Sequence, residues 1–204
     1  MPTRINAVLR RIPRGAVWLA GLIPLGLLVL DTVQGRLGVD PLAAIEHRTG
    51  RTAVYFLVAG LCVTPLLRIA GINLMRFRRA LGMLGFLYAA LHVVVWAVLD
   101  RGLIWSQIIG EILHRPFVTI GAASMAVLVV LAATASDFAI RRLGSRCWRR
   151  IHWGVYAAVP LAGWHWLLSE KVPGMLVHVI LFVVLVLLGF RVWFSVRRRV
   201  VFGG

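Results

Sequence analysis

Three histidines, His92, His152 and His165, lie within long apolar segments of this 204-residue chain. Ionisable side chains are rare inside membrane helices, and those that occur there usually serve a function. A neutral imidazole carries one nitrogen with a free lone pair, which makes histidine the most common metal ligand among side chains. These three residues are therefore the first candidates for a buried metal or redox site.

The apolar segments that contain them are long enough to cross a bilayer. The chain is 60% hydrophobic with a mean hydropathy of +0.88. A spanning helix needs about 20 apolar residues. This composition predicts an all-α integral membrane protein with a single domain over residues 1–204 and a core at about 40–195. Six transmembrane helices are predicted, at 16–33, 52–70, 80–99, 117–136, 151–168 and 174–194.

Basic residues are concentrated on one side of this topology. Of 23 Arg and Lys residues, 17 fall at the two chain ends and in the second and fourth connections, and Arg197–Arg199 are among them. Positive residues favour the cytoplasmic side, so both termini are predicted to be cytoplasmic. The basic loops are expected to contact lipid headgroups. Because these residues alternate with apolar segments instead of lining one soluble face, nucleic-acid binding is not expected.

The predicted topology places His92 and His165 at one depth. The third and fifth spans run in the same direction, and both histidines lie about 20 Å from the cytoplasmic ends at about 1.5 Å per residue. Two imidazoles on parallel helices can clamp a planar metal cofactor from both faces, and histidine is a common axial ligand of haem. A haem ligated on both faces has no open position, which favours electron transfer over oxygen binding.

His152 indicates a second, less complete site. It precedes His165 by thirteen residues, which places it about 20 Å nearer the cytoplasm. On a straight helix the two side chains would point about 140° apart, and a shared face requires a kink at Pro160. The residue fourteen positions before His92 is Arg78. Arginine stays protonated and is a poor iron ligand, so Arg78 is expected to pair with a haem propionate or to face an open side.

Structural roles compete with these interpretations. A single membrane histidine can bond to a backbone carbonyl, and His152 can be an interfacial residue at a helix start. His47 and His114 are expected in outer connections and His178 shallowly in the sixth span, without a cofactor role. The small residues of "GAAS" in the fourth span predict close helix packing. No CxxCH motif is present, which excludes covalent c-type haem attachment.

Several motifs resemble one known family. The segments "EHRTGRTAVYFLVAGLCVTPLLR", "RFRRALGMLGFLYAALH", "RPFVTIG" and "RRIHWGVYAAVPLAGWHW" are similar, in order and spacing, to the bacterial MsrQ (YedZ) family of the ferric reductase-like transmembrane superfamily. The resemblance runs from about residue 40 to the end of the fifth span. It implies a b-type haem, or two, with His92, His152 and His165 as iron ligands. Arg78 stands where relatives with four ligands have a histidine.

The resemblance also implies a function and partners. The chain would be an electron-transfer subunit of the bacterial inner membrane, serving a periplasmic molybdenum-cofactor reductase of protein methionine sulfoxide. The substrate site would lie on that partner chain. No G-x-G-x-x-G segment occurs in a βαβ context, so electrons are expected from a cytoplasmic flavin reductase, a bound flavin mononucleotide (FMN) or the quinone pool.

Two other functions stay open from the sequence. One is a quinol-linked cytochrome b that serves a different reductase. The other is a small transporter in which the histidines form a proton relay. The spans contain few carboxylates for such a relay, which favours the redox interpretations.

Overall fold

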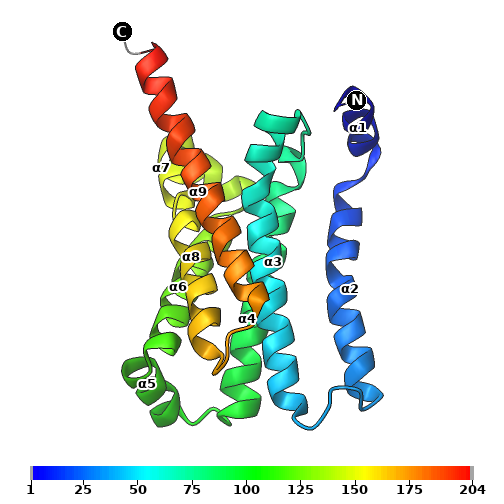
Figure 1. Cartoon of the computed structure of the whole chain (residues 1–204), viewed down its shortest axis with the longest axis vertical. Coiled ribbons are helices and arrows are strands. Elements are labelled where there is room, and N and C mark those ends of the chain that lie inside the picture. The colour runs from blue at the N-terminus through cyan, green and yellow to red at the C-terminus, as the bar shows by residue number, and fades with distance from the viewer. Residues whose placement is uncertain (1, 203–204) are drawn as a thin grey trace.

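The computed structural model describes the backbone of residues 2–202 and the side chains of residues 4–194 (Figure 1). Within this range the chain is helical and contains no β-strand. A 3₁₀ turn, η1 (Met75–Phe77), precedes α4, and a π-helical segment, η2 (Val95–Asp100), follows it. The α-helices are α1 (Pro2–Arg11), α2 (Arg14–Val33), α3 (Pro41–Ala70), α4 (Arg78–Val94), α5 (Trp105–His114), α6 (Pro116–Ala133), α7 (Asp137–His152), α8 (Val155–Ser169) and α9 (Met175–Phe202).

Five of the six predicted spans correspond to helices long and apolar enough to cross a bilayer. In the described part of the chain these are Arg14–Val33, Pro41–Ala70, Met75–Asp100, Pro116–Ala133 and Met175–Phe194. Their outward faces carry large exposed apolar side chains such as Leu19, Phe182 and Leu185, as expected of surfaces that contact lipid. The helix α8 has 15 residues, which is shorter than the span of about 20 that a bilayer core requires.

The predicted span at 52–70 is only part of a longer helix. Asp40 caps α3 by accepting a hydrogen bond from the backbone N–H of Ala43 at 3.0 Å, and Pro41 occupies the first helical turn. Both features favour helix initiation at this point. His47 therefore lies within α3, and its expected place in a connection is wrong. Hydropathy located the apolar part of this helix but not its polar first turns.

The predicted span at 151–168 is wrong as one continuous helix. His152 ends α7, and α8 begins at Val155 after a turn at Trp153 and Gly154. A Cβ at Gly154 would lie 3.0 Å from Val127 Cγ1 and 3.1 Å from the Ile151 carbonyl oxygen, so the turn is packed tightly. The 140° rotation expected between His152 and His165 does not apply, because the helix is interrupted before Pro160.

The basic segments gather at one end of the bundle. Figure 1 shows α1, α7 and the C-terminal end of α9 at this end, and α5 with the α2–α3 connection at the other. Arg76 donates hydrogen bonds from Nη1 to the carbonyls of Leu9 and Arg10, at 3.3 and 2.7 Å. It thereby satisfies carbonyls left free at the C-terminus of α1. The side chains of Arg197–Arg199 lie outside the described residues.

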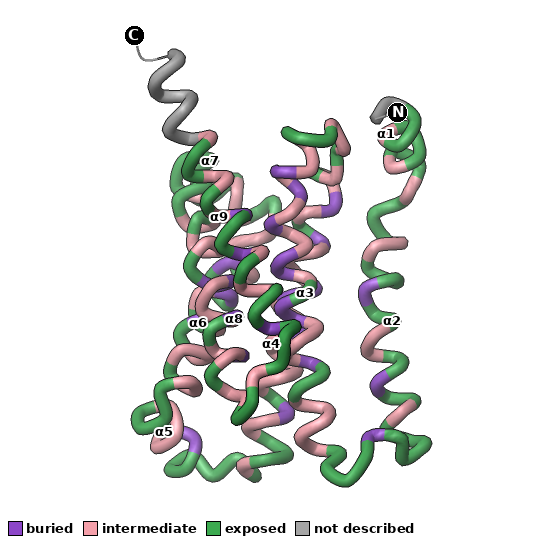
Figure 2. Tube along the Cα trace, in the orientation of Figure 1, coloured by how far each residue is buried: buried purple, intermediate pink, exposed green. Residues whose placement is uncertain are grey.

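The core lies between α3, α6, α8 and α9. Leu57 and Leu61 of α3 pack with Leu128 of α6 and Val159 of α8 in one buried cluster, which Val177 and Val184 of α9 complete. Figure 2 shows the buried positions concentrated along the central helices, while α2 is mostly exposed or intermediate. The packing of α3 and α6 against α8 therefore fixes the helix that carries His165.

Tyr88 of α4 joins the peripheral α2 to the bundle. Its hydroxyl donates to the Gly21 carbonyl at 2.8 Å and accepts from the Leu25 N–H at 3.0 Å. These two backbone groups are an i, i+4 pair, so the hydroxyl is inserted into the hydrogen-bond ladder of α2. Tyr88 is 1% exposed, and its polar group has no access to water.

We expect Tyr88→Phe to lower the free energy of unfolding by about 1 kcal/mol, the scale of an interhelical hydrogen bond in a membrane protein. Chemical denaturation in detergent measures the change. Tyr55→Phe is the matched control because Tyr55 is 39% exposed. Equal effects of both substitutions would contradict a specific role for the Tyr88 hydroxyl.

Candidate functional site

His92 and His165 face each other inside the bundle. His92 lies in the last turn of α4, directly before η2, and His165 lies in the second half of α8. Their ring centroids are 6.0 Å apart and their planes are inclined by 71°. Both line a cavity of ≈ 410 Å³ between α3, α4, α6 and α8, which we call the histidine-pair cavity; its wall also includes Gly50, Leu57, Trp96, Phe117, Gly121, Leu128 and Trp166.

The Nδ1 atom of each imidazole is bonded to a helix carbonyl. His92 Nδ1 lies 2.9 Å from the Glu46 carbonyl oxygen of α3, and His165 Nδ1 lies 2.7 Å from that of Phe117 of α6. A carbonyl oxygen only accepts, so Nδ1 carries the hydrogen in both rings. The lone pair of each neutral imidazole is then on Nε2, which is the arrangement of a metal-ligating histidine.

The ring separation fits a single metal ligated from both sides. A metal–imidazole bond is about 2 Å long and the ring centre lies about 1 Å beyond the nitrogen, so such rings are separated by about 6 Å. The inclination of 71° is compatible, because ligation by two imidazoles requires no particular angle between their planes. In the described residues no group of three or more His, Cys, Asp or Glu side chains is arranged to hold a metal ion. The pair therefore suits a metal whose remaining ligands belong to a cofactor.

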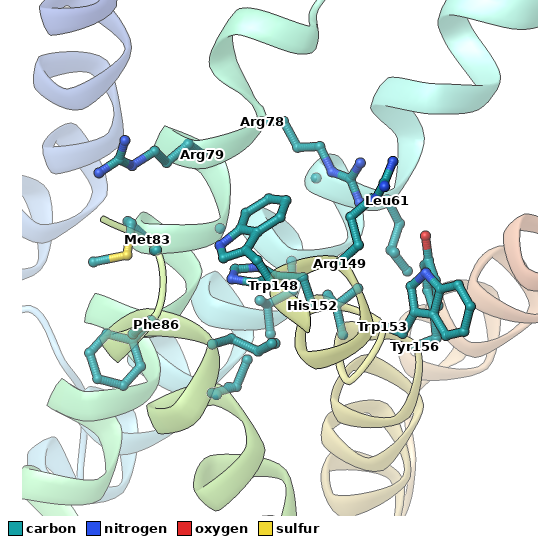
Figure 3. A pocket seen from close by; sticks show the side chains of 18 of the residues that line it. Leu61, Arg78, Arg79, Met83, Phe86, Trp148, Arg149, His152, Trp153 and Tyr156 are labelled. Carbon is teal, nitrogen blue, oxygen red and sulfur yellow. The ribbon is translucent and has the colours of Figure 1, made fainter. Parts of the chain in front are cut away.

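A second cavity contains His152 and Arg78. It measures ≈ 550 Å³ and lies among α3, α4, α6, α7 and α8; we call it the His152 cavity. Figure 3 shows Arg78 from the start of α4, with Trp148, Arg149 and His152 from α7, around this space. The sequence predicted that Arg78 and His152 share one site, and the structure places both on one cavity wall.

Trp148 and Thr134 hold the His152 ring in place. It stacks on Trp148 with centroids 4.1 Å apart, and Nε2 lies 3.2 Å from the Thr134 hydroxyl. Trp148 in turn donates from its indole nitrogen to the Thr134 carbonyl at 2.9 Å. No second histidine of the described chain lines this cavity. Thr134 and Trp148 were not identified from the sequence, since neither residue type signals a role at this spacing.

The two cavities adjoin each other. Leu57 of α3 and Leu128 of α6 line both of them. Each volume lies in the range of about 300–1,000 Å³ that is usual for ligand sites in proteins. Two ligand-sized spaces are thus separated by apolar side chains along the axis of the bundle.

An ion pair beside the histidine-pair cavity joins α3 to the end of α8. Arg51 Nη2 lies 2.8 Å from Glu170 Oε1, which also accepts a hydrogen bond from the Trp166 indole at 2.8 Å. The Arg51 guanidinium lies 5.6 Å from the Trp166 ring centroid. The pKa of Glu170 is lowered, mainly by the hydrogen bond from the Trp166 indole. Burial acts in the opposite direction, while the Gly174 N–H and Arg51 lower the pKa further.

Comparison with known families identifies the class of protein. Residues 49–163 match the family described as "Ferric reductase like transmembrane component". These residues include His92 and His152 but not His165, together with α4, α6, α7 and most of α8. The fold and the match define a ferric reductase-like membrane protein.

Similar proteins of known name define a narrower family within this class. Three are the "Protein-methionine-sulfoxide reductase heme-binding subunit MsrQ" of Brucella ovis, Brucella canis and Brucella melitensis. Each is 42% identical over 168 residues, covering 79% of this chain and 76% of the relative. The chain belongs to the MsrQ family, and it is a multi-pass protein of the bacterial inner membrane.

We expect Glu170→Gln to remove an acid-sensitive part of the stability. Because the folded-state pKa of Glu170 is lowered, its carboxylate stabilises the fold fully above the ordinary glutamate pKa. That contribution is lost as the pH falls through the lowered folded-state value. Apparent Tm measured against pH in detergent should fall more steeply on acidification for the unsubstituted protein than for Glu170→Gln.

The control for this comparison is Asp137→Asn. Asp137 also pairs with an arginine, Arg79, but its side chain is 73% exposed. An exposed pair contributes little, so this variant should retain the acid sensitivity of the parent. Identical pH profiles for Glu170→Gln and the parent protein would show that the ion pair does not stabilise the α3–α8 contact.

Proposed function

We propose that this chain is a haem-binding membrane subunit of a protein-methionine-sulfoxide reductase, and that it carries electrons across the inner membrane. The observation that supports this most directly is the facing pair of His92 and His165, with ring centroids 6.0 Å apart. The related Brucella proteins are named as haem-binding subunits of such a reductase. When bound, a b-type haem supplies a one-electron carrier.

The role of the histidine-pair cavity is to hold and insulate this carrier. The Glu46 and Phe117 carbonyls keep each Nδ1 protonated and each Nε2 available as a ligand. A haem held by both histidines would carry electrons and would not bind oxygen. Leu57, Leu128 and the other apolar side chains of the wall exclude water from the site. The chain residues thereby favour electron transfer and disfavour side reactions.

We propose that the His152 cavity holds a second haem, with His152 as its single histidine ligand. This requires the His152 ring to exchange its contact with the Thr134 hydroxyl for the metal. Arg78 and Arg149 line the same cavity and would pair with the anionic propionate groups, as charge-assisted hydrogen bonds favour. FMN, which also carries an anionic group, is a second candidate for this space.

The proposed direction of transfer is from the cytoplasm to the periplasm. The basic end of the bundle, with α1 and α7, would face the cytoplasm under the positive-inside rule. Both termini lie on one side of the membrane only if the number of passes is even, so α8 would add a sixth crossing to the five longer helices. The His152 cavity lies nearer this end, beside α7, and would receive electrons from a flavin reductase or quinone. The opposite end would deliver them to a periplasmic molybdenum-cofactor subunit that holds the substrate site.

We expect His92→Ala and His165→Ala each to abolish most low-spin haem in protein purified after expression with haem supplied. Each substitution removes one of the two ligands of one metal. The absorption spectrum and the haem content per chain measure the loss. His178→Ala is the control, because His178 is exposed and its Nδ1 is bonded to the Gly174 carbonyl at 3.0 Å. Full low-spin haem in both alanine variants would refute the assignment.

We expect the unsubstituted protein to hold two haems per chain and His152→Ala to hold one. The remaining haem should keep the low-spin spectrum of the histidine-pair site, because His92 and His165 are unchanged. Iron and chain concentration measured on the same sample give the ratio. A single haem in both proteins would exclude the second haem and leave the His152 cavity to FMN or another anion.

A further inference from the structure

We propose that Gly50 and Gly121 are positioning residues for the two facing histidines. Each glycine leaves one backbone carbonyl open, so that an imidazole Nδ1–H can bond to it from a neighbouring helix. This inference rests on the proposed function, in which the oriented rings ligate one metal.

The same arrangement occurs twice, on helices far apart in the sequence. His92 Nδ1 contacts the Glu46 carbonyl of α3, and Gly50 follows Glu46 by four residues. His165 Nδ1 contacts the Phe117 carbonyl of α6, and Gly121 follows Phe117 by four residues. A Cβ at Gly50 would lie 3.1 Å from His92 Nδ1, and a Cβ at Gly121 would lie 2.7 Å from His165 Nδ1.

Helix geometry explains the spacing of four. A helical carbonyl already accepts a bond from the N–H four residues later, and only its second lone pair is free. The Cα–Cβ bond tilts toward the helix N-terminus, so the side chain at that later residue lies over the turn that contains the carbonyl. Without a Cβ the ring can reach the free lone pair. With a methyl group there, the ring must move away.

Other glycines of the described chain do not share this environment. A Cβ at Gly21 would meet Leu84 at 2.3 Å, and a Cβ at Gly163 would meet Leu181 at 2.8 Å, which is close helix packing against apolar side chains. Gly26 and Gly189 have nothing within 4 Å of a Cβ. Among the described glycines, only Gly50 and Gly121 would meet an imidazole. The small residues of "GAAS" were expected to serve close helix packing. The first of them, Gly121, also makes room for the His165 ring.

The hydrogen bonds that these glycines permit would tune a haem held by the two histidines. A donor bond from Nδ1–H makes the imidazole a more basic ligand. A more basic ligand stabilises the higher oxidation state, so loss of the bond should raise the midpoint potential. A tenfold weakening of ferric relative to ferrous binding corresponds to a rise of about 59 mV for one electron.

The test compares Gly121→Ala and Gly50→Ala in the full chain, loaded with haem. Redox titration followed by absorption gives the midpoint potential of the low-spin haem, and haem content gives its retention. We expect Gly121→Ala to cause the larger rise in potential or loss of haem, because its Cβ would lie 2.7 Å from the imidazole nitrogen. Gly50→Ala should cause a smaller change, because the corresponding distance is 3.1 Å. Loss of a hydrogen bond to a metal-ligating residue typically weakens metal binding by about 10–100-fold.

Two controls separate positioning from packing. Gly21→Ala introduces a steric clash remote from the histidines and should lower thermal stability while the potential stays unchanged. Gly189→Ala introduces a methyl group in open space and should change neither quantity. A rise in potential for Gly21→Ala equal to that for Gly121→Ala would overturn the inference, because the effect would then be general.

The outcomes distinguish this inference from the proposed function. Absence of low-spin haem from the unsubstituted protein would reject both. Low-spin haem in the unsubstituted protein, with the same potential and content in Gly50→Ala and Gly121→Ala, would reject only the positioning role. Where Gly121→Ala fails to fold, the milder Gly50→Ala decides, since its contact requires a shift of only a few tenths of an ångström.

Discussion

Two hydrogen bonds from imidazole Nδ1 to helix carbonyls fix the geometry on which the site depends. The bilayer core offers no water to polar groups, and an unsatisfied imidazole N–H there is costly. The Glu46 and Phe117 carbonyls provide the acceptors for His92 and His165. The orientation of each ring is therefore set by the depth and rotation of a neighbouring helix, α3 for one and α6 for the other. The buried core between these helices and the Arg51–Glu170 pair keep that register.

The two cavities differ in the charge and symmetry of the side chains that line them. The histidine-pair cavity has two facing histidines from two helices and mostly apolar walls. The His152 cavity has one histidine, an indole stacked on it and several arginines at its edge. A neutral, symmetric environment suits an insulated electron carrier. A basic, asymmetric one suits an anionic ligand and lies beside the end of the bundle that carries most of the charge.

The proximity of His92 and His165 was accessible from the sequence because helical rise is regular. Counting residues along two spans predicted that His92 and His165 lie at one level, and the structure brings them together. The break at Gly154 was not predictable from hydropathy, since apolar residues continue on both sides of it. The early start of α3 was missed because its first turns are polar. The roles of Gly50 and Gly121 depend on which helices meet, and this is tertiary information that a single sequence does not contain.

The preference for arginine also has a structural reason beyond topology. Of the 23 basic residues, 22 are arginine, although lysine satisfies the positive-inside rule equally well. Arg191 shows what arginine adds: Nη2 donates to the Leu61 carbonyl at 2.7 Å while Nη1 bonds to the Tyr156 hydroxyl. Arg76 likewise bridges two carbonyls of α1. A planar guanidinium can bond to separate acceptors at once and remains charged when partly desolvated, whereas an ammonium is held more strongly by water. At the basic end of this bundle, Arg76 and Arg191 therefore also join neighbouring helices by donating hydrogen bonds to their carbonyls.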